Sequence, residues 1–344
     1  MKTFKNKAII SLILAIMGSS TMQAQEAIPK KIHHKSSPNS HAPIGVMGDH
    51  MHLKNEWMVS YRYMNMTMRE LKEGSNDVPF SEALNNYMVT PTRMDMQMHM
   101  VGVMYAPSDK ITLSLMLPYT EYEMGHVTRM NTSFTSSNSG IGDITISALY
   151  QLLEKGNANL HTQIGIIIPS GSIEGKDLTP ASEPNEVLLP YPMQIGSGSW
   201  GINTALTYTY NADKWSFGAQ TRLILRTNTN ENDYKLGNAY RLTGWSGYAI
   251  NNWLSFSGRL GIRVIERIDG SNPVLDPNMV VTADTENSGG ILSDAALGFN
   301  ILLPDGFLKN LRLATEYSNP IYQNLNGIQL KVQSQILIGL QYGF

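Results

Sequence analysis

Residues 327–344 alternate apolar and polar side chains almost without a break and end on a phenylalanine. Successive side chains of a β-strand point to opposite faces. One face of this segment would carry Ile328, Leu330, Val332, Ile336, Ile338, Leu340, Tyr342 and Phe344, and the other Gln329, Lys331, Gln333, Gln335 and Gln341. A strand with one apolar face and one row of amides and charge is typical of a wall between lipid and water. The segment therefore predicts a strand of a transmembrane barrel.

The first residues indicate export. Lys2, Lys5 and Lys7 precede an apolar run over residues 8–17, and small and polar residues follow as far as Ala24. This pattern predicts a cleaved secretory signal peptide over residues 1–24. No later segment reaches about 18 consecutive apolar residues, so a membrane protein with this sequence would cross the bilayer as a closed sheet. We expect it in the bacterial outer membrane.

Composition excludes several classes of function. The chain has no cysteine, which rules out disulfides and thiolate chemistry. Its net charge of −2 gives no electrostatic basis for binding nucleic acid.

The rest of the chain has the rhythm of a barrel. Period-two patterns predict twelve strands, at approximately residues 56–68, 94–106, 111–124, 141–153, 159–168, 199–210, 215–227, 239–250, 253–267, 290–303, 311–318 and 327–344. Short turns alternate strictly with long loops over residues 69–93, 125–140, 169–198, 228–238, 268–289 and 319–326. Short periplasmic turns and long external loops are typical of outer-membrane barrels. The sequence therefore predicts an all-β, antiparallel up-and-down transmembrane barrel over residues 54–344.

Residues 25–53 show no strand pattern. They contain prolines and five of the eight histidines, His33, His34, His41, His50 and His52. This composition predicts a His-rich periplasmic arm or a partial plug. The arm could provide a weak site for Zn or Cu(II), or it could be a solvated polar linker.

Methionine is concentrated in one part of the chain, since fifteen of the twenty lie between Met47 and Met130. Thioether and imidazole groups together suit soft Cu(I) or Ag(I). The candidate ligands are His50, His52, Met64, Met66, Met68, Met94, Met96 and Met98. Alternation places Met64, Met66 and Met68 on the lumen face beside Arg62, whereas Met94–Met100 could face either the lumen or lipid. The alternative is that methionine simply provides a flexible apolar lining.

Charged side chains are also predicted to point inward. They are Arg62, Asp143, Arg222, Arg226, Arg241, Arg259, Arg263, Asp294, Arg312, Glu316 and Lys331. Opposite charges can pair across strands and brace the wall. The surplus of basic groups favours anionic solutes.

No catalytic constellation is present in the sequence pattern. A barrel hydrolase would need a histidine, a serine and an orienting acid or amide on one wall, and His126 and His161 are isolated candidates. We expect no enzyme activity.

Several strand-end and turn motifs resemble those of a known family, the outer-membrane transporters associated with the meta-pathway of phenol degradation. The motifs are Ser139-Gly140-Ile141-Gly142-Asp143, Ile168-Pro169-Ser170-Gly171, Met104-Tyr105-Ala106-Pro107-Ser108-Asp109 and Leu117-Pro118-Tyr119. The likeness covers most of residues 45–344. It implies an outer-membrane barrel of transporter type that passes small hydrophobic compounds.

We therefore expect an outer-membrane channel or transporter for a small hydrophobic or anionic solute, with no resident cofactor. The terminal Phe344 resembles the signal read by the barrel-assembly machinery, so that machinery and membrane lipid are the expected partners. The alternatives are a barrel that handles copper or another soft metal through its Met and His clusters, a surface barrel that transports nothing, and a barrel hydrolase.

Overall fold

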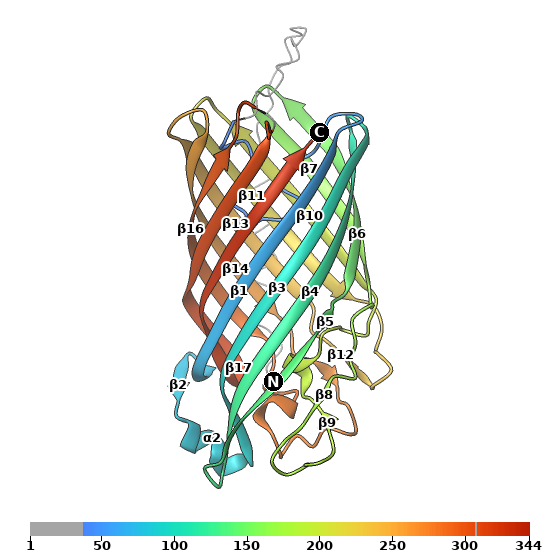
Figure 1. Ribbon diagram of the computed structural model, residues 1–344, viewed down its shortest axis with the longest axis vertical. Helices are drawn as coiled ribbons and strands as arrows, with labels where there is room; N and C mark the ends of the chain where they lie inside the picture. The colour runs from blue at the N-terminus through green and yellow to red at the C-terminus, as the bar shows by residue number, and fades with distance from the viewer. Residues whose placement is uncertain (1–36, 307) are drawn as a thin grey trace, which may run out of the picture. The chain divides into compact units, whose positions relative to one another are not determined.

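The computed structural model describes residues 37–306 and 308–344, which form one antiparallel sheet closed into a barrel (Figure 1). The predicted signal peptide over residues 1–24 and the first part of the predicted arm, residues 25–36, lie outside the described residues. The barrel closes because the last strand pairs with the first, from Met58 opposite Gly343 onward. Within the described residues, no helix has the length and hydropathy that crossing a bilayer requires.

The wall is built from strands that are neighbours in sequence. They are β1 (Trp57–Gly74), β3 (Val89–Ser108), β4 (Ile111–Thr128), β5 (Ser133–Ile141), β6 (Ile144–Lys155), β7 (Ala158–Ile168), β10 (Gly201–Asn211), β11 (Trp215–Arg226), β13 (Ala239–Ala249), β14 (Leu254–Ile265), β16 (Gly290–Leu302) and β17 (Leu311–Gly343). Each pairs antiparallel with its neighbours around the ring.

The number of strand labels differs from the number of times the chain crosses the wall. β17 crosses twice, since residues 312–325 pair with β16 and residues 328–343 pair with β1. β5 and β6 make one crossing beside β4, interrupted at Gly142 and Asp143. The wall therefore has twelve crossings, which confirms the predicted up-and-down barrel.

Two predicted loops are mostly strand. Residues 125–140 were expected to be irregular, but β4 runs on to Thr128 and β5 pairs with it along Ser133–Ile141. Residues 319–326 were also expected to be a loop, yet β17 stays extended until it turns near Gly327, which has φ +59°. These hairpins extend the wall without apolar alternation, so a search for that pattern could not find them.

The connections at one end carry short extra elements (Figure 1). They are β2 (Asn76–Val78), α2 (Phe80–Asn86), β8 (Lys176–Asp177), β9 (Val187–Leu188), η2 (Tyr191–Met193), β12 (Tyr234–Lys235), β15 (Asp269–Gly270) and η3 (Val281–Ala283). The opposite end carries the short turns, the start of β1 and the C-terminus. In outer-membrane barrels the short turns face the periplasm and the long loops face outside.

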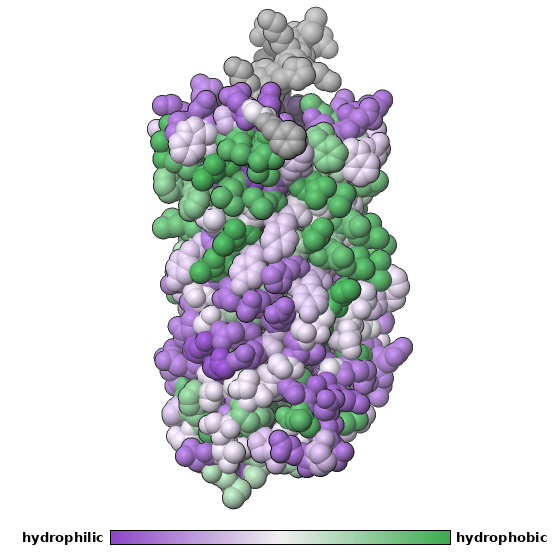
Figure 2. Space-filling view, viewed as in Figure 1, coloured by the Kyte–Doolittle hydropathy of each residue, from purple (hydrophilic) through white to green (hydrophobic). Residues whose placement is uncertain are grey.

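On the face drawn in Figure 2, apolar side chains form a belt near the short-turn end, and the surface toward the long loops is mostly polar. In β1, Trp57, Val59 and Tyr61 are exposed on the outside, as expected for side chains that contact lipid. Farther along the same wall, Arg69 pairs with Asp95 at 3.0 Å. A tilted strand needs about 9–11 residues to span a bilayer, and β1 has 18. The wall therefore continues well beyond the belt on the side of the long loops.

Candidate functional site

Residues 37–52 lie inside the barrel, and residues 53–56 connect them to β1 at its rim. We call residues 37–56 the inner segment. Their polar groups bond to side chains from strands all around the ring. Arg312 of β17 and Ser255 of β14 donate to the carbonyl of Pro38 at 2.7 and 2.9 Å. Gln220 of β11 donates to the carbonyl of Met47 at 2.9 Å, and His161 of β7 contacts the carbonyl of Gly48 at 2.9 Å. The N–H of His52 donates to Thr112 of β4 at 3.1 Å. Partners on five strands mean that the inner segment crosses the lumen.

Packing also fixes the inner segment. Ile44 is buried against Ala314, Leu337 and Met64. The neighbouring wall residue is Gly339, and a Cβ added there would lie 2.6 Å from Cδ1 of Ile44. The absence of a side chain at this position creates the space that Ile44 occupies.

A cavity of about 540 Å³ lies between the inner segment and the long loops. Ile44, Gly45 and Met47 of the inner segment line it, as do Pro192 and Thr282 of the loops. Its wall includes the methionines Met64, Met66, Met68, Met94, Met96, Met98, Met100 and Met124. We call this cavity the methionine chamber. Its volume falls within the range of about 300–1,000 Å³ that is usual for small-molecule sites.

The methionines of β1 and β3 face each other in register. Met64 lies opposite Met98, Met66 opposite Met96, and Met68 opposite Met94. Directly opposed side chains of antiparallel strands have Cβ atoms about 4.5–5.5 Å apart. Both rows face the lumen, which decides the orientation of Met94–Met100 that alternation left open.

Arginines line the same chamber. Arg62, Arg241 and Arg263 all contribute to its surface. Nε and Nη1 of Arg62 and Nε of Arg241 are buried and have no hydrogen-bond partner among residues 37–306 and 308–344. Buried donors are normally satisfied. The chamber therefore offers positive charge and free donors beside its apolar wall.

A buried ion-pair network lies on the same side of the barrel. Arg259 donates to Glu316 at 2.7 Å and to Asp294 at 2.6 Å, and Arg241 lies 3.8 Å from Asp294. The side chains of Glu316 and Arg259 are 0% and 2% exposed. These contacts connect β13, β14, β16 and β17, so this part of the wall is braced by charge.

The other predicted inward charges hold loops or the inner segment in place. Asp143 accepts hydrogen bonds from the N–H groups of Ser197 and Gly171 at 3.1 and 3.2 Å, and it lies 3.6 Å from Arg226. Arg222 donates to the carbonyl of Met47 in the inner segment at 3.3 Å and to Gln163 of β7 at 3.1 Å. Arg312, described above, donates to residues 37–40. Each of these charged side chains therefore has a partner within the protein and does not serve only to line the chamber.

Lys331 departs from the sequence prediction. The register between β1 and β17 shifts at Gln333, where β17 carries one extra residue. Such a bulge exchanges the two faces of the strand, so the residues just before Gln333 lie on the opposite faces from those that the alternation after it predicts. Leu330 and Val332 therefore line the chamber, and Lys331 between them points away from it and pairs with Glu70 at 2.6 Å. The predicted lumen position of Lys331 is wrong for this reason.

His50 and His52 lie in the inner segment and not among the paired methionines. His50 stacks on His41, with ring centroids 3.8 Å apart, and His52 meets His50 edge-on at 5.0 Å. Ligand atoms of His41, Asp49 and His50 lie within 4.8 Å of one another. The sequence singled out His50 and His52 but did not connect them to His41 and Asp49, because only the folded loop brings residues 41 and 49 together.

The two isolated histidines have structural partners. Nε2 of His126 lies 2.9 Å from Oγ of Ser136, and both residues are buried. Nδ1 of His126 has no partner, so no acid orients the ring in the part of the chain that the structure describes. His161 holds the inner segment through Gly48. Neither arrangement forms a hydrolase triad.

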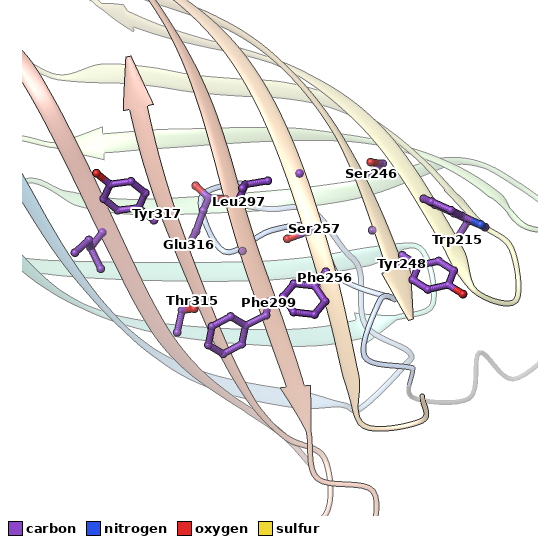
Figure 3. Close-up of a pocket in the computed structure, with 14 residues that line it drawn as sticks. Trp215, Ser246, Tyr248, Phe256, Ser257, Leu297, Phe299, Thr315, Glu316 and Tyr317 are labelled. Atoms are coloured by element: carbon purple, nitrogen blue, oxygen red, sulfur yellow. The ribbon is translucent and has the colours of Figure 1, made fainter. Parts of the chain in front are cut away.

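A second cavity of about 510 Å³ lies on the outer face of the wall (Figure 3). Aromatic side chains including Trp215, Phe256 and Tyr317 surround it, and glycines such as Gly258 form its base. These aromatic side chains are half exposed on the outside. We interpret this groove as a site for lipid chains.

The sequence was compared with known families and structures. The model of the family described as "Putative MetA-pathway of phenol degradation" matches residues 85–270. That stretch is more than half of the 344 residues. The chain belongs to this family. A search of curated proteins finds no match.

The structure of the COG4313 outer membrane channel from Pseudomonas putida F1 is similar, with a TM-score of 0.62 and 13% sequence identity, over 87% of this chain and 99% of that one. The NanC porin covers 81% of this chain and 98% of its own, with a TM-score of 0.41 and 10% identity. The first likeness confirms the fold of an outer-membrane barrel.

The family match extends from α2 to β15. It includes the methionine row of β3, but the row of β1, the histidine cluster and the inner segment all lie before residue 85. The family match therefore carries no information on the methionine row of β1, the histidine cluster or the inner segment.

Proposed function

We propose that the protein is an outer-membrane channel for a small organic anion with an apolar body, and that the inner segment holds it closed. The methionine chamber carries this proposal, because it combines an apolar wall with three arginines inside a closed barrel. The inner segment lies on the short-turn side of the chamber and the long loops lie on its other side, so a solute passes only when the inner segment moves.

Charge favours an anion in the chamber. Arg62 and Arg241 present buried donors that no acceptor in the described part of the chain satisfies. At an effective dielectric constant of 20, a unit charge about 6 Å from a guanidinium gains or loses roughly 3 kcal/mol. Three arginines therefore favour a carboxylate and oppose a free cation.

The methionines suit the apolar part of such a solute. Methionine has three rotatable bonds and a polarizable sulfur, so it adapts to ligands of different shape. Paired rows on β1 and β3 present a continuous apolar surface beside Arg62, and Arg241 and Arg263 line the chamber from β13 and β14. A ring or short chain could lie on this surface while its carboxylate contacts Arg62 or Arg241.

The proposal is tested by ion selectivity. Refolded protein would be inserted into planar bilayers with a gradient of sodium benzoate, and the reversal potential would give the relative permeability of benzoate and sodium. We expect benzoate to be preferred by at least about tenfold, which corresponds to about 1.4 kcal/mol. Equal permeability or a preference for sodium would contradict the proposal. A barrel that never opens would favour the non-transporting surface role.

A second candidate is passage of Cu(I) or Ag(I). The three opposed methionine pairs favour it, because thioethers bind soft ions without losing a proton. The arginines of the chamber oppose it. Ag(I) titration of a variant with Met64, Met66 and Met68 changed to leucine would decide, with Met88→Leu and Met279→Leu in the loops as the matched control. Loss of affinity only in the triple variant supports this candidate, and equal affinity removes it.

Insertion is part of the same proposal. Phe344 exchanges two backbone hydrogen bonds with Trp57, each of 2.9 Å, where the barrel closes. We propose that the barrel-assembly machinery recognises this last strand before closure. Deletion of Phe344 should reduce the amount of protein in the outer membrane, and an unchanged amount would contradict this role.

A further inference from the structure

The histidine cluster of the inner segment has the composition and geometry of a metal site. His41, Asp49 and His50 bring ligand atoms within 4.8 Å of one another. In a tetrahedral site with metal–nitrogen bonds of about 2.0–2.1 Å, neighbouring donors are about 3.3 Å apart. Small side-chain rotations would therefore bring these donors into one coordination shell.

The hydrogen bonds leave ring nitrogens free to bind. Nδ1 of His50 lies 3.0 Å from the carboxylate of Asp49, and Nδ1 of His52 lies 3.5 Å from that of Glu56. Nε2 of both rings and Nδ1 of His41 are buried and have no hydrogen-bond partner among the residues that the structure describes. A histidine that binds a metal through one nitrogen commonly gives the other to a carboxylate. His50 and His52 have this arrangement without any further change.

The surrounding charge also suits a ligand role. The carboxylate of Asp49 is buried beside the rings and supplies a negative charge for a cation. The nearby charge of Arg312 is directed elsewhere, since its guanidinium donates to Ser37, Pro38 and Ser40.

We propose that His41 and His50, with His52 or Asp49, bind a borderline divalent ion, Zn(II) or Cu(II). Nitrogen and oxygen donors favour these ions over the softer Cu(I). The ligands come from the two ends of the loop formed by residues 41–50. The backbone N–H of Ala42 already donates to Asp49 at 2.8 Å across the base of that loop.

The position of the site suggests what the ion does. The tip of the same loop, with Ile44, Gly45 and Met47, lines the methionine chamber. An ion that joins His41 to His50 would fix the base of the loop and so hold its tip in the lumen. The ion would act as a latch on the closed channel, a role that rests on the proposed channel function.

Binding is tested without any transport assay. The full mature chain, refolded in detergent, would compete with a chromophoric chelator for Zn(II). We expect one tight site, weakened at least about 100-fold in His41→Ala and in His50→Ala, and about 10- to 100-fold in Asp49→Asn. His99→Ala, on the outer wall, is the matched control and should bind as the wild type does. Wild-type affinity in His50→Ala, or no tight binding by the wild type, would overturn the site.

The latch is tested separately by single-channel recording. Zn(II) should lower the open probability of the wild type about tenfold, a chelator should restore it, and His50→Ala should respond to neither. Heat-modifiable mobility on gels would check that each variant is folded. Binding with unchanged gating would overturn the latch. A channel that stays shut with and without Zn(II) would overturn the proposed function and leave the binding result standing.

Discussion

The two sides of the chamber differ in how their side chains are held. On β1 and β3, methionines meet methionines and form no ion pair. On β13 to β17, Arg259 is locked to Glu316 and Asp294, and Arg241 adds to the network. The methionine side can change shape at little cost, whereas the charged side cannot. The difference indicates that stability depends on the charged side and that solute adaptability depends on the methionine side.

The largest effect should come from breaking the charged side. Arg259→Ala leaves Glu316 buried without its main partner, and removing one member of a buried pair costs about 3–5 kcal/mol. The free energy of unfolding, measured by urea titration in micelles, should fall by that amount. Lys331→Ala breaks an exposed pair at the rim and should change little. Equal stability of Arg259→Ala and the wild type would show that the network does not brace the barrel.

A second substitution distinguishes the stability of the wall from the docking of the inner segment. Ile44→Ala removes a buried side chain, and such truncations cost about 2–5 kcal/mol. The loss should weaken docking of the inner segment and leave the unfolding of the barrel unchanged. Protease cleavage before Trp57 should therefore become faster. Leu53→Ala, whose side chain is 48% exposed, serves as the control, and equal cleavage of both variants would contradict the role of Ile44.

Arg241 lies at the edge of the charged network, 3.8 Å from Asp294, so the chamber arginines should affect selectivity more than stability. Arg241→Gln together with Arg263→Gln removes two positive charges from the lining. We expect the preference for benzoate over sodium to fall by about tenfold, or about 1.4 kcal/mol. Reversal potentials measure this preference. If selectivity stays the same, the charges that attract the solute lie elsewhere.

The smallest effect should come from the methionine side. Changing Met64, Met66 and Met68 to leucine conserves volume, and such swaps usually cost less than about 1.5 kcal/mol each. Stability and benzoate selectivity should both stay close to those of the wild type. A large loss of stability, measured in the same urea titration, would mean that this side is as rigid as the charged one.

Much of the fold was predictable because lipid imposes a period-two pattern on every strand inside the belt. The inward positions of Met64, Met66, Met68 and the paired arginines followed from that pattern. Beyond the belt both faces of the wall contact water or polar loops, so the pattern disappears. For this reason the sequence predicted a loop where β5 forms. Asp95 and His99 are polar although they lie on the outer face, so the alternation could not show that the methionines between them face the lumen.

The remaining errors have local causes. One extra residue at Gln333 reversed the face of Lys331, and a bulge leaves no clear signal in composition. The histidine cluster depends on a loop that folds back on itself inside the barrel, so spacing along the chain could not relate His41 to His50. Its only signal in the sequence was the enrichment of histidine before the first strand.

The central claim is that the inner segment closes the lumen. The most direct test compares the single-channel conductance of the full mature chain with that of a chain lacking residues 37–50. The wall pairs β1 with β17 without help from these residues, so the shortened barrel should fold. We predict brief, rare openings for the full chain and a large, steady conductance for the shortened one. Identical conductance in both would contradict the account.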